Sequence, residues 1–416
     1  MTRRASNLIL LGIVIGLVCA GISLALFGQR MVAVQVLGEF FLKSLRMIVV
    51  PLVVASVVVG ITGLGDVRRL GRVGIRTILY YMATTCLAVA IGIVVVSIIQ
   101  PGTGVPTEGI EAPEHVEAKK EIGWTDILLS FVDENVFKSL NDMQMLPIIV
   151  FSLIFGGVLT TIGEKGRPVI AVFDGVNDAI MKIVHMIMWM APVGIFGLVA
   201  YRFAAAGGPE EWKEVLTSLG LYMATVLIGL GIHAFVVLPI LCAILGRRNP
   251  VRHFLAMIPA ILTAWSTASS SATLPLTIDC AEERAGMSKR AAGFVLPVGA
   301  TINMDGTALY ESVAAIFIAQ AYGIDLSLGQ VILIFVTATL ASIGAAGIPE
   351  AGLFTMVIVL TAVDLPIEGV GLLLTVDWLL DRFRTATNVW GDSVGVSYID
   401  RVTGTDPPAP TTGAAV

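Results

Sequence analysis

Five polar side chains recur at helical spacing within an otherwise apolar stretch at residues 376–396. They are Asp377, Asp381, Arg384, Asn388 and Asp392, spaced four, three, four and four residues apart. At 3.6 residues per turn, this spacing places all five on one face of a helix. Ionisable groups are expensive at membrane depth, where they usually mark a functional site. The stretch therefore predicts a polar binding site inside a protein-lined cavity.

The residue types on this face suit a ligand that carries both an acid and an amine. Arg384 offers a planar fork for a carboxylate, and Asp381 accepts hydrogen bonds from an ammonium group. Thr385 lies on the same side and Arg382 on its flank. The alternative for Asp381 and Arg384 is a structural ion pair at i, i+3.

Composition excludes most soluble classes of protein. The chain has 416 residues, of which 56% are hydrophobic and 14% charged, whereas soluble chains carry about 25% charged residues. The mean hydropathy is +0.89. No basic patch interleaved with aromatic residues suggests nucleic acid binding, and the four cysteines show no metal-binding or disulfide spacing. The composition predicts an integral membrane protein, which leaves a cytoplasmic amphipathic helix as the weaker interpretation of 376–396.

Apolar runs long enough to cross a membrane recur along the first 250 residues. They lie at about 7–27, 36–64, 76–100, 143–162, 170–203 and 215–246. Lys and Arg concentrate at the N-terminus and in alternate connections, so those parts are expected to be cytoplasmic. The glutamate-rich segment 104–126 then forms an outer loop.

Two later segments are broken at their centres. Residues 254–285 are interrupted by a Ser/Thr run at 266–273, and residues 328–363 by a Gly-rich run at 342–352. Each arm has about a dozen residues and reaches about 18 Å, well short of a hydrocarbon core of about 30 Å. We expect two re-entrant hairpins, one entering from each side, separated by a span at 291–321 that is itself interrupted at 303–307. Such paired interruptions in an inverted repeat indicate a transporter's binding site.

The interruptions supply complementary chemistry. Unpaired amides at half-helix starts near 269–271 and 346–348 suit a carboxylate, and freed carbonyls at 342–345 suit a cation. Asn303, Asp305, Asn388 and Asp392 add hard oxygen ligands without sulfur or imidazole, which favours an alkali cation over zinc. Taken singly, either tip is equally consistent with small residues that allow close helix packing.

The chain resembles the excitatory amino-acid transporter family of dicarboxylate/amino acid:cation symporters. The resemblance is carried by Asn303-Met304-Asp305-Gly306-Thr307, the serine-rich tip, the segments 344–349 and 381–392, and upstream by 47–52 and 145–150. It implies an all-α fold of eight transmembrane helices and two re-entrant hairpins. It also implies a homotrimer that takes up glutamate or aspartate with sodium, by an elevator movement, with no enzymatic activity or cofactor.

The resemblance implies a division of the chain and a cellular location. Scaffold helices occupy 1–75, helix 3 and the outer loop 76–126, helices 4 to 6 residues 127–246, the transport core 247–401, and a disordered tail 402–416. The protein is expected in the plasma (inner) membrane, with both termini cytoplasmic.

Family binding positions fall on particular residues of this chain. The substrate-binding set implied is Ser269, Ser270, Met304, Thr307, Ile348, Asp381, Arg384, Thr385 and Asn388. The sodium positions implied are Gly299, Asn303, Asn388 and Asp392 for one ion, Thr301, Ser342, Ile343 and Ala345 for a second, and Tyr81, Thr84, Thr85, Asn303 and Asp305 for a third.

Glu311 and Arg382 resemble the animal rather than the archaeal members of the family. By this resemblance Glu311 is expected to accept a proton, and potassium counter-transport becomes compatible with the site. The alternative is a carboxylate paired permanently with Arg382. Glu350 departs from the glutamine usual in the animal proteins.

Three other functions remain open at this point. A neutral amino-acid exchanger of the same family would lack an arginine at position 384, and a C4-dicarboxylate symporter would leave Asp381 unpaired. A passive anion channel is the alternative from a different class. An intramembrane serine hydrolase is disfavoured, because no histidine follows His253.

Overall fold

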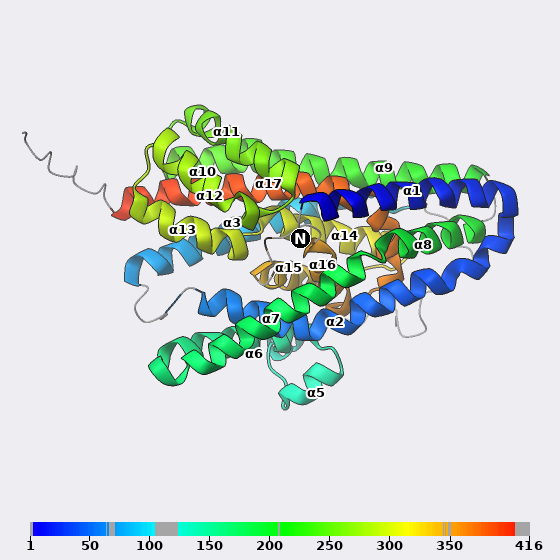
Figure 1. Ribbon diagram of the computed structural model, residues 1–416, viewed down its shortest axis with the longest axis horizontal. Coiled ribbons are helices and arrows are strands. Elements are labelled where there is room, and N and C mark those ends of the chain that lie inside the picture. The colour runs from blue at the N-terminus through cyan, green and yellow to red at the C-terminus, as the bar shows by residue number, and fades with distance from the viewer. Residues whose placement is uncertain are drawn as a thin grey trace, which may run out of the picture.

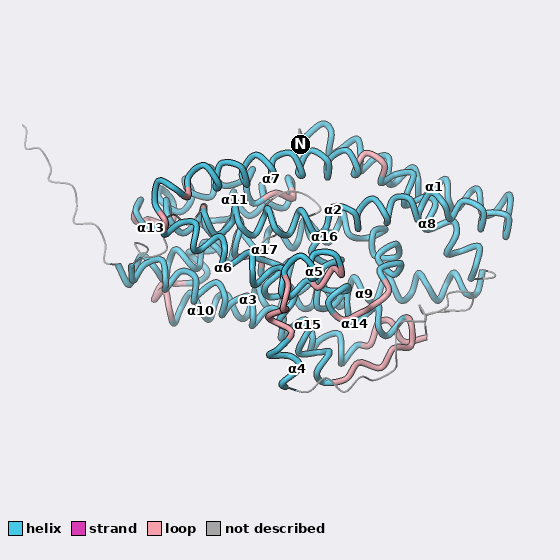
Figure 2. The backbone as a smooth tube through the Cα atoms, turned by 90° about the horizontal axis from the view of Figure 1, so that it is seen from below, coloured by secondary structure: helices cyan, strands magenta, loops and turns pink. Residues whose placement is uncertain are grey.

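The structure is a computed structural model that describes residues 3–63, 65, 71–104, 124–206, 209–343, 345, 347 and 351–403. Within these ranges the chain forms helices and no strand, which confirms the all-α prediction. Most of the long helices run along the long axis of the molecule in both views (Figure 1, Figure 2). The predicted outer-loop glutamates and most of the predicted tail lie outside the described residues.

A first group of helices comes from the N-terminal half of the chain. It consists of α1 (Arg3–Phe27), the 3-10 segment η1 (Gly28–Val34), α2 (Gln35–Thr62), α6 (Met145–Thr161), α7 (Arg167–Met188) and α8 (Ala191–Ala206). α1 packs against α8, and α2 packs against α6, α7 and α8. Two short helices, α4 (Trp124–Leu129) and α5 (Val136–Asn141), and the 3-10 turn η2 (Gly163–Lys165) connect this part of the chain.

A second group surrounds the polar helix of the C-terminal end. It consists of α3 (Gly71–Ile99), α9 (Pro209–Ile232), the π-helical turn η3 (His233–Val237), α10 (Leu238–Ile244), α13 (Lys289–Ile302), α14 (Asp305–Ala321), the 3-10 turn η5 (Ile367–Gly369) and α17 (Val370–Thr403). α3 packs against α9 and α14, and α17 contacts both α13 and α14. In Figure 1, α17 runs lengthwise through the molecule in orange to red.

The two broken segments form helical hairpins. Hairpin 1 consists of α11 (Pro250–Thr267), α12 (Ser270–Asp279) and the π-helical turn η4 (Cys280–Arg284), and it turns at Ala268, which has a left-handed φ of 50°. Hairpin 2 consists of α15 (Leu328–Ile343) and α16 (Ala351–Ala362). Hairpin 1 packs against α13 and α17, and hairpin 2 against α14. The predicted break in 291–321 is also present, since α13 ends at Ile302 and α14 begins at Asp305.

Three predicted boundaries were wrong. The first arm of hairpin 1 has 18 residues rather than about a dozen. It begins at Pro250, before the predicted start at 254, because the Asn249 side chain caps the helix there by accepting from the Arg252 amide. The span predicted at 170–203 is two helices, α7 and α8, bent by 51°, since Pro192 lacks an N–H and disfavours a continuous helix. α17 runs over Val370–Thr403 rather than 376–396, so the first two residues of the predicted tail are helical.

Length and composition identify the membrane-crossing candidates within the described ranges. Three helical stretches qualify, namely Leu11–Thr62, Val73–Ile99 and Lys213–Ile244, and a fourth does if the bent pair α7 and α8 counts as one span. The chain is therefore a helical membrane protein.

A charged clamp ties three chain segments together at one end of the second group. Arg248 donates to the carbonyls of Ala285 and Gly286 at 2.6 and 3.2 Å and to Asp400 at 2.9 Å. The other Asp400 oxygen accepts from the Ser288 amide at 3.1 Å. Because Asp400 is buried, losing its cationic partner leaves a desolvated charge.

We expect Arg248→Met to lower the free energy of unfolding by about 2–3 kcal/mol, since several hydrogen bonds to charged groups disappear. Thermal unfolding of the detergent-solubilised protein measures this change. Arg284→Met removes an exposed arginine nearby and is the matched control. Equal thermal unfolding midpoints for the two variants would contradict a stabilising role of the Arg248 contacts.

Candidate functional site

The polar face of α17 is buried in protein along its whole length. Its five polar residues each have an exposed fraction of 6% or less; they are Asp377, Asp381, Arg384, Asn388 and Asp392. Hairpin 1, α13 and α14 all pack against α17. The face therefore lies inside the protein and not against lipid or bulk solvent.

Arg384 is held by two carboxylates of its own helix. Its Nη1 donates to Asp377 Oδ1 and its Nη2 to Asp381 Oδ1, both at 2.8 Å. The guanidinium carbon lies 3.9 Å from the ring centroid of Tyr310, a cation–π distance. The ion pair between Asp381 and Arg384, which the sequence left open as an alternative, is present in this structure.

A small pocket lies where the two hairpin tips meet α14 and α17. It is lined by Ala268, Ser270, Met304, Thr307, Ala345, Gly347, Ala351, Gly352, Asp381, Thr385 and Asn388. Arg384 lies directly behind Gly352, where a Cβ would come within 2.9 Å of its Nη1. The hydroxyl, amide and carboxylate groups of this lining suit a small, polar ligand.

The two hairpin tips touch each other through one backbone carbonyl. Gly347 O accepts from Ser269 Oγ at 2.6 Å and from the Ser271 amide at 3.1 Å. Ser269 Oγ also caps α12 by accepting from the Ala272 amide. The pocket is thus closed between the tips. Ile348, predicted to bind substrate, and Glu350 lie outside the described residues.

Asn388 connects α17 to the broken helix. Its Oδ1 accepts from the Gly306 amide at 2.7 Å, which satisfies an amide at the start of α14. Its Nδ2 points at Met304 Sδ, 3.2 Å away, and Thr307 Oγ1, 3.4 Å away. Met304, Thr307 and Asn388, three residues predicted to bind substrate, are therefore brought together with Ser270, Asp381 and Thr385 around one pocket.

A first cluster of oxygen atoms surrounds Asp392. Asn303 Nδ2 donates to Asp392 Oδ1 at 2.9 Å, and the Asn303 amide donates to the Gly299 carbonyl at 2.9 Å. Gly299 lies so close to Asp392 that a Cβ would collide with its carboxylate. The structure thus brings together Gly299, Asn303 and Asp392, and Asn388 lies one helical turn from Asp392.

A second cluster joins α3 to the start of α14. Thr84 Oγ1 donates to Asn303 Oδ1 at 3.1 Å and to the Tyr81 carbonyl at 3.0 Å. Thr85 Oγ1 donates to Asp305 Oδ1 at 2.8 Å. All five residues predicted for the third sodium position therefore lie together. Tyr81 contributes its backbone, since its hydroxyl donates to the Val295 carbonyl.

The remaining predicted cation group lies at the base of the hairpin 2 tip. The Ala345 amide donates to the Ser342 carbonyl at 3.2 Å, and Ile343 is the last residue of α15. Thr301 lies on α13 beside Ala300, whose carbonyl oxygen comes close to Gly347. Described contacts thus bring α13 to this tip, but none joins Thr301 directly to Ser342.

The clusters suit a hard monovalent cation. Their donors are carboxylate, amide, hydroxyl and carbonyl oxygens, which alkali ions prefer to sulfur or imidazole. Among the described residues, no group of three His, Cys, Asp or Glu side chains is placed to hold a metal.

Glu311 and Arg382 do not pair with each other. Glu311 is fully buried on α14, and neither carboxyl oxygen has a hydrogen-bond partner in the described part of the chain. Arg382 instead donates to the carbonyls of Trp265 and Ser266 and lies over the Trp265 ring. The permanent pair considered from the sequence is therefore absent.

Four residues of the site make contacts that the sequence did not predict. Asp377 belongs to the predicted stripe, but its ion pair with Arg384, two turns away on α17, was not predicted. Tyr310 precedes Glu311, and its contact with Arg384 was not predicted either. Gly347 and His233 gave no signal beyond a glycine-rich tip and a lone histidine, because their contacts join segments distant in sequence.

Comparison with known proteins agrees with the geometry. The profile described as "Sodium:dicarboxylate symporter family" matches residues 6–402. Excitatory amino acid transporter 3 of Mus musculus is 43% identical over 448 residues, covering 95% of this chain and 84% of that protein. The human transporter of the same name is 43% identical, covering 88% and 78%. Excitatory amino acid transporter 1 of Ambystoma tigrinum is 43% identical, covering 88% and 76%. The chain belongs to the sodium:dicarboxylate symporter family.

Proposed function

We propose that this protein takes up glutamate or aspartate together with sodium ions. The observation that carries this proposal is a pocket between the hairpin tips that Asp381 lines, with the guanidinium of Arg384 paired to Asp381 and lying directly behind Gly352 of the lining. An acidic amino acid presents the two complementary groups, an ammonium and a side-chain carboxylate. The names of the similar transporters favour the same substrate class.

Binding proceeds by exchange of partners. The substrate's side-chain carboxylate takes the Nη2 of Arg384, and Asp381, released from it, receives the substrate's ammonium group. Asp377 stays on Nη1 and keeps the guanidinium in place. The substrate's second carboxylate meets the Ser270 amide at the start of α12, since the Ser271 and Ala272 amides already donate within the tips. A dicarboxylate without an amine takes Nη2 of Arg384 from Asp381 and offers no ammonium group in return, which costs free energy.

Cation coupling follows from the charge balance of the core. Among the described residues of the site, four buried aspartates face one buried guanidinium, that of Arg384. The aspartates are Asp305, Asp377, Asp381 and Asp392. An acidic amino acid adds another net negative charge to this desolvated region. Sodium ions at the three oxygen groups compensate it, because unpaired buried charges are costly. Sodium is therefore a co-substrate in this proposal.

Uptake of radiolabelled aspartate and glutamate into proteoliposomes tests the function. Inward sodium, proton and outward potassium gradients are set independently. We expect accumulation with a sodium gradient and none when choline replaces sodium. Accumulation in choline would overturn sodium coupling, and uptake of succinate or alanine in preference to both amino acids would overturn the substrate class.

We assign proton co-transport to Glu311, and potassium counter-transport is compatible with this assignment. An ionised carboxylate without a partner is very costly in these surroundings, whereas a protonated one costs much less. Glu311 is thus suited to move through the membrane with its proton.

We expect Glu311→Gln to retain sodium-dependent exchange of labelled for unlabelled aspartate while net uptake loses its response to a proton gradient. Glutamine imitates the protonated acid but cannot release the proton. Comparing exchange with net uptake at several external pH values measures this difference. Glu283→Gln, at an exposed position of η4, is the control. A proton response that survives in Glu311→Gln would remove the assignment.

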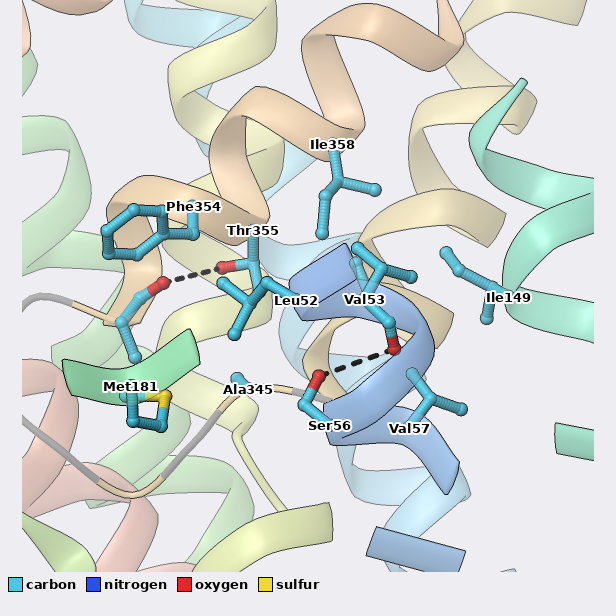
Figure 3. A pocket seen from close by; sticks show the side chains of 12 residues that line it. Leu52, Val53, Ser56, Val57, Ile149, Met181, Ala345, Phe354, Thr355 and Ile358 are labelled. Carbon is cyan, nitrogen blue, oxygen red and sulfur yellow. Dashed lines mark hydrogen bonds between the residues drawn. The ribbon is translucent and has the colours of Figure 1, made fainter. Parts of the chain in front are cut away.

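The remaining proposals concern architecture. The first is a homotrimer in the plasma membrane, with cytoplasmic termini, eight spans and two hairpins in each chain. The second is a transport core that moves as an elevator against the scaffold helices, with hairpin 2 as the outer gate. A largely apolar crevice between α2 and α16 supports the movement (Figure 3). Its walls are Leu52, Val53 and Val57 of α2, and Phe354 and Ile358 of α16. Non-directional apolar contacts let such surfaces slide.

A further inference from the structure

A buried histidine contacts the second oxygen cluster from the side opposite to its threonines. His233 Nε2 lies 3.0 Å from Asp305 Oδ2, and both side chains are fully buried. Asp305 Oδ1 meanwhile accepts from Thr85 Oγ1. The two oxygens of this carboxylate are therefore engaged by different elements, Oδ2 from η3 and Oδ1 from α3.

The backbone around His233 is specialised. His233 opens the π-helical turn η3, an uncommon local structure that occurs often at functional sites. Pro239, just after this turn, has no N–H to donate within the helix. The Ala234 carbonyl in the turn accepts from Trp390 Nε1 of α17 at 3.0 Å. The turn is thus fixed to Asp305 through His233 and to α17 through Ala234.

The contacts also fix the direction of the hydrogen bond. His233 Nδ1 has no partner among the described residues. A carboxylate oxygen accepts, so the proton of this hydrogen bond lies on Nε2. His233 therefore donates to Asp305 Oδ2.

We propose that His233 is a positioning residue for a sodium ion bound at Asp305. Its Nε2–H holds Oδ2, so that Oδ1 stays turned toward the oxygens of Thr84, Thr85 and Asn303. Without this donor the carboxylate rotates, and Oδ2, buried and unpaired, competes with Oδ1 for the same partners. Donors behind a metal ligand have this role in other sites, where their loss typically weakens metal affinity about 10- to 100-fold.

This inference rests on the third sodium position proposed above, and the experiment separates the two. His233→Gln and His233→Met have similar side-chain shapes but differ in one donor group. The sodium concentration that gives half-maximal aspartate uptake is measured for both. Stabilisation of the purified protein against heating by sodium alone gives a second readout that does not depend on transport.

We expect His233→Met to need about tenfold more sodium in both assays and to recover normal maximal uptake at saturating sodium. His233→Gln should stay within about threefold of the unchanged protein, because its amide donates to Oδ2. His253→Phe is the control, since His253 is equally buried but packs against Trp390, away from Asp305.

Two results would overturn the positioning role. One is an unchanged sodium requirement in His233→Met, and the other is an equal increase in the Met and Gln variants, which indicates packing alone. Asp305→Asn tests the underlying site. If Asp305→Asn leaves the sodium requirement unchanged, the third sodium position itself is wrong. If Asp305→Asn raises it but His233→Met does not, only the role of His233 is wrong.

Discussion

Arg384→Ala is expected to abolish uptake of aspartate and glutamate, because no other described guanidinium or ammonium group reaches the pocket. In the structure its two Nη groups donate to Asp377 and Asp381, and its plane lies on the Tyr310 ring. Truncating one partner of a buried, hydrogen-bonded charge pair costs about 2–5 kcal/mol. That cost corresponds to a fall in affinity of about 30-fold to several thousandfold.

The variant also leaves two buried carboxylates without their cation, so stability must be measured separately. We compare Arg384→Ala with Arg384→Ala combined with Asp377→Asn, which removes one unpaired charge. The combined variant should regain thermal stability, because a lone buried charge is the costly element. Uptake of acidic amino acids should not return, since the guanidinium that binds the side-chain carboxylate is still missing.

Arg384→Lys refines the interpretation. Lysine keeps the charge but loses the fork that serves Asp377 and the substrate at once, so we expect weak uptake with a KM raised about tenfold or more. Acidic uptake that persists in Arg384→Ala, in protein that folds normally, would show that the substrate's side chain is bound elsewhere.

Local features of the site were predictable from the sequence because each depends on periodicity or on breaks in it. The stripe from Asp377 to Asp392 follows from helical spacing. The hairpins follow from the Ser/Thr run at 266–273 and the Gly-rich run at 342–352, and the break at 303–307 from an Asn and an Asp within an apolar run. Each of these signals is contained in one continuous stretch of the chain.

Contacts between distant segments were not predictable in this way. The pairing of His233 with Asp305 joins residues 72 positions apart, and that of Ser269 with Gly347 joins residues 78 apart. Arg384 illustrates a related limit, because the i, i+3 spacing placed Asp381 within reach without deciding between a structural pair and a substrate site. The structure contains this pair and a second pair with Asp377 that the sequence did not predict. The proposed mechanism uses exchange of the Asp381 pair.

Gly347→Ala is expected to raise the KM for acidic amino acids about 10- to 100-fold by preventing closure of hairpin 2. The Gly347 carbonyl accepts from both Ser269 and Ser271, so the two tips approach within hydrogen-bond distance. A Cβ at this position would collide with the Ser271 hydroxyl and lie 2.6 Å from the Ala300 carbonyl oxygen. Backbone atoms cannot rotate away, and such overpacking costs about 1–3 kcal/mol.

The closed pocket then loses its cover, and substrate exchanges with solvent before it is carried. Sodium binding at Asp305 should change little, because that cluster is built from α3 and α14 and contains no hairpin residue. Substrate-dependent and sodium-dependent thermal stabilisation measure the two effects separately. Gly293→Ala, with no atom near its added Cβ, is the matched control on α13. An unchanged KM in Gly347→Ala would mean that the tips need not touch for transport, and Ser269→Ala, which removes one of the two donors, should then also be silent.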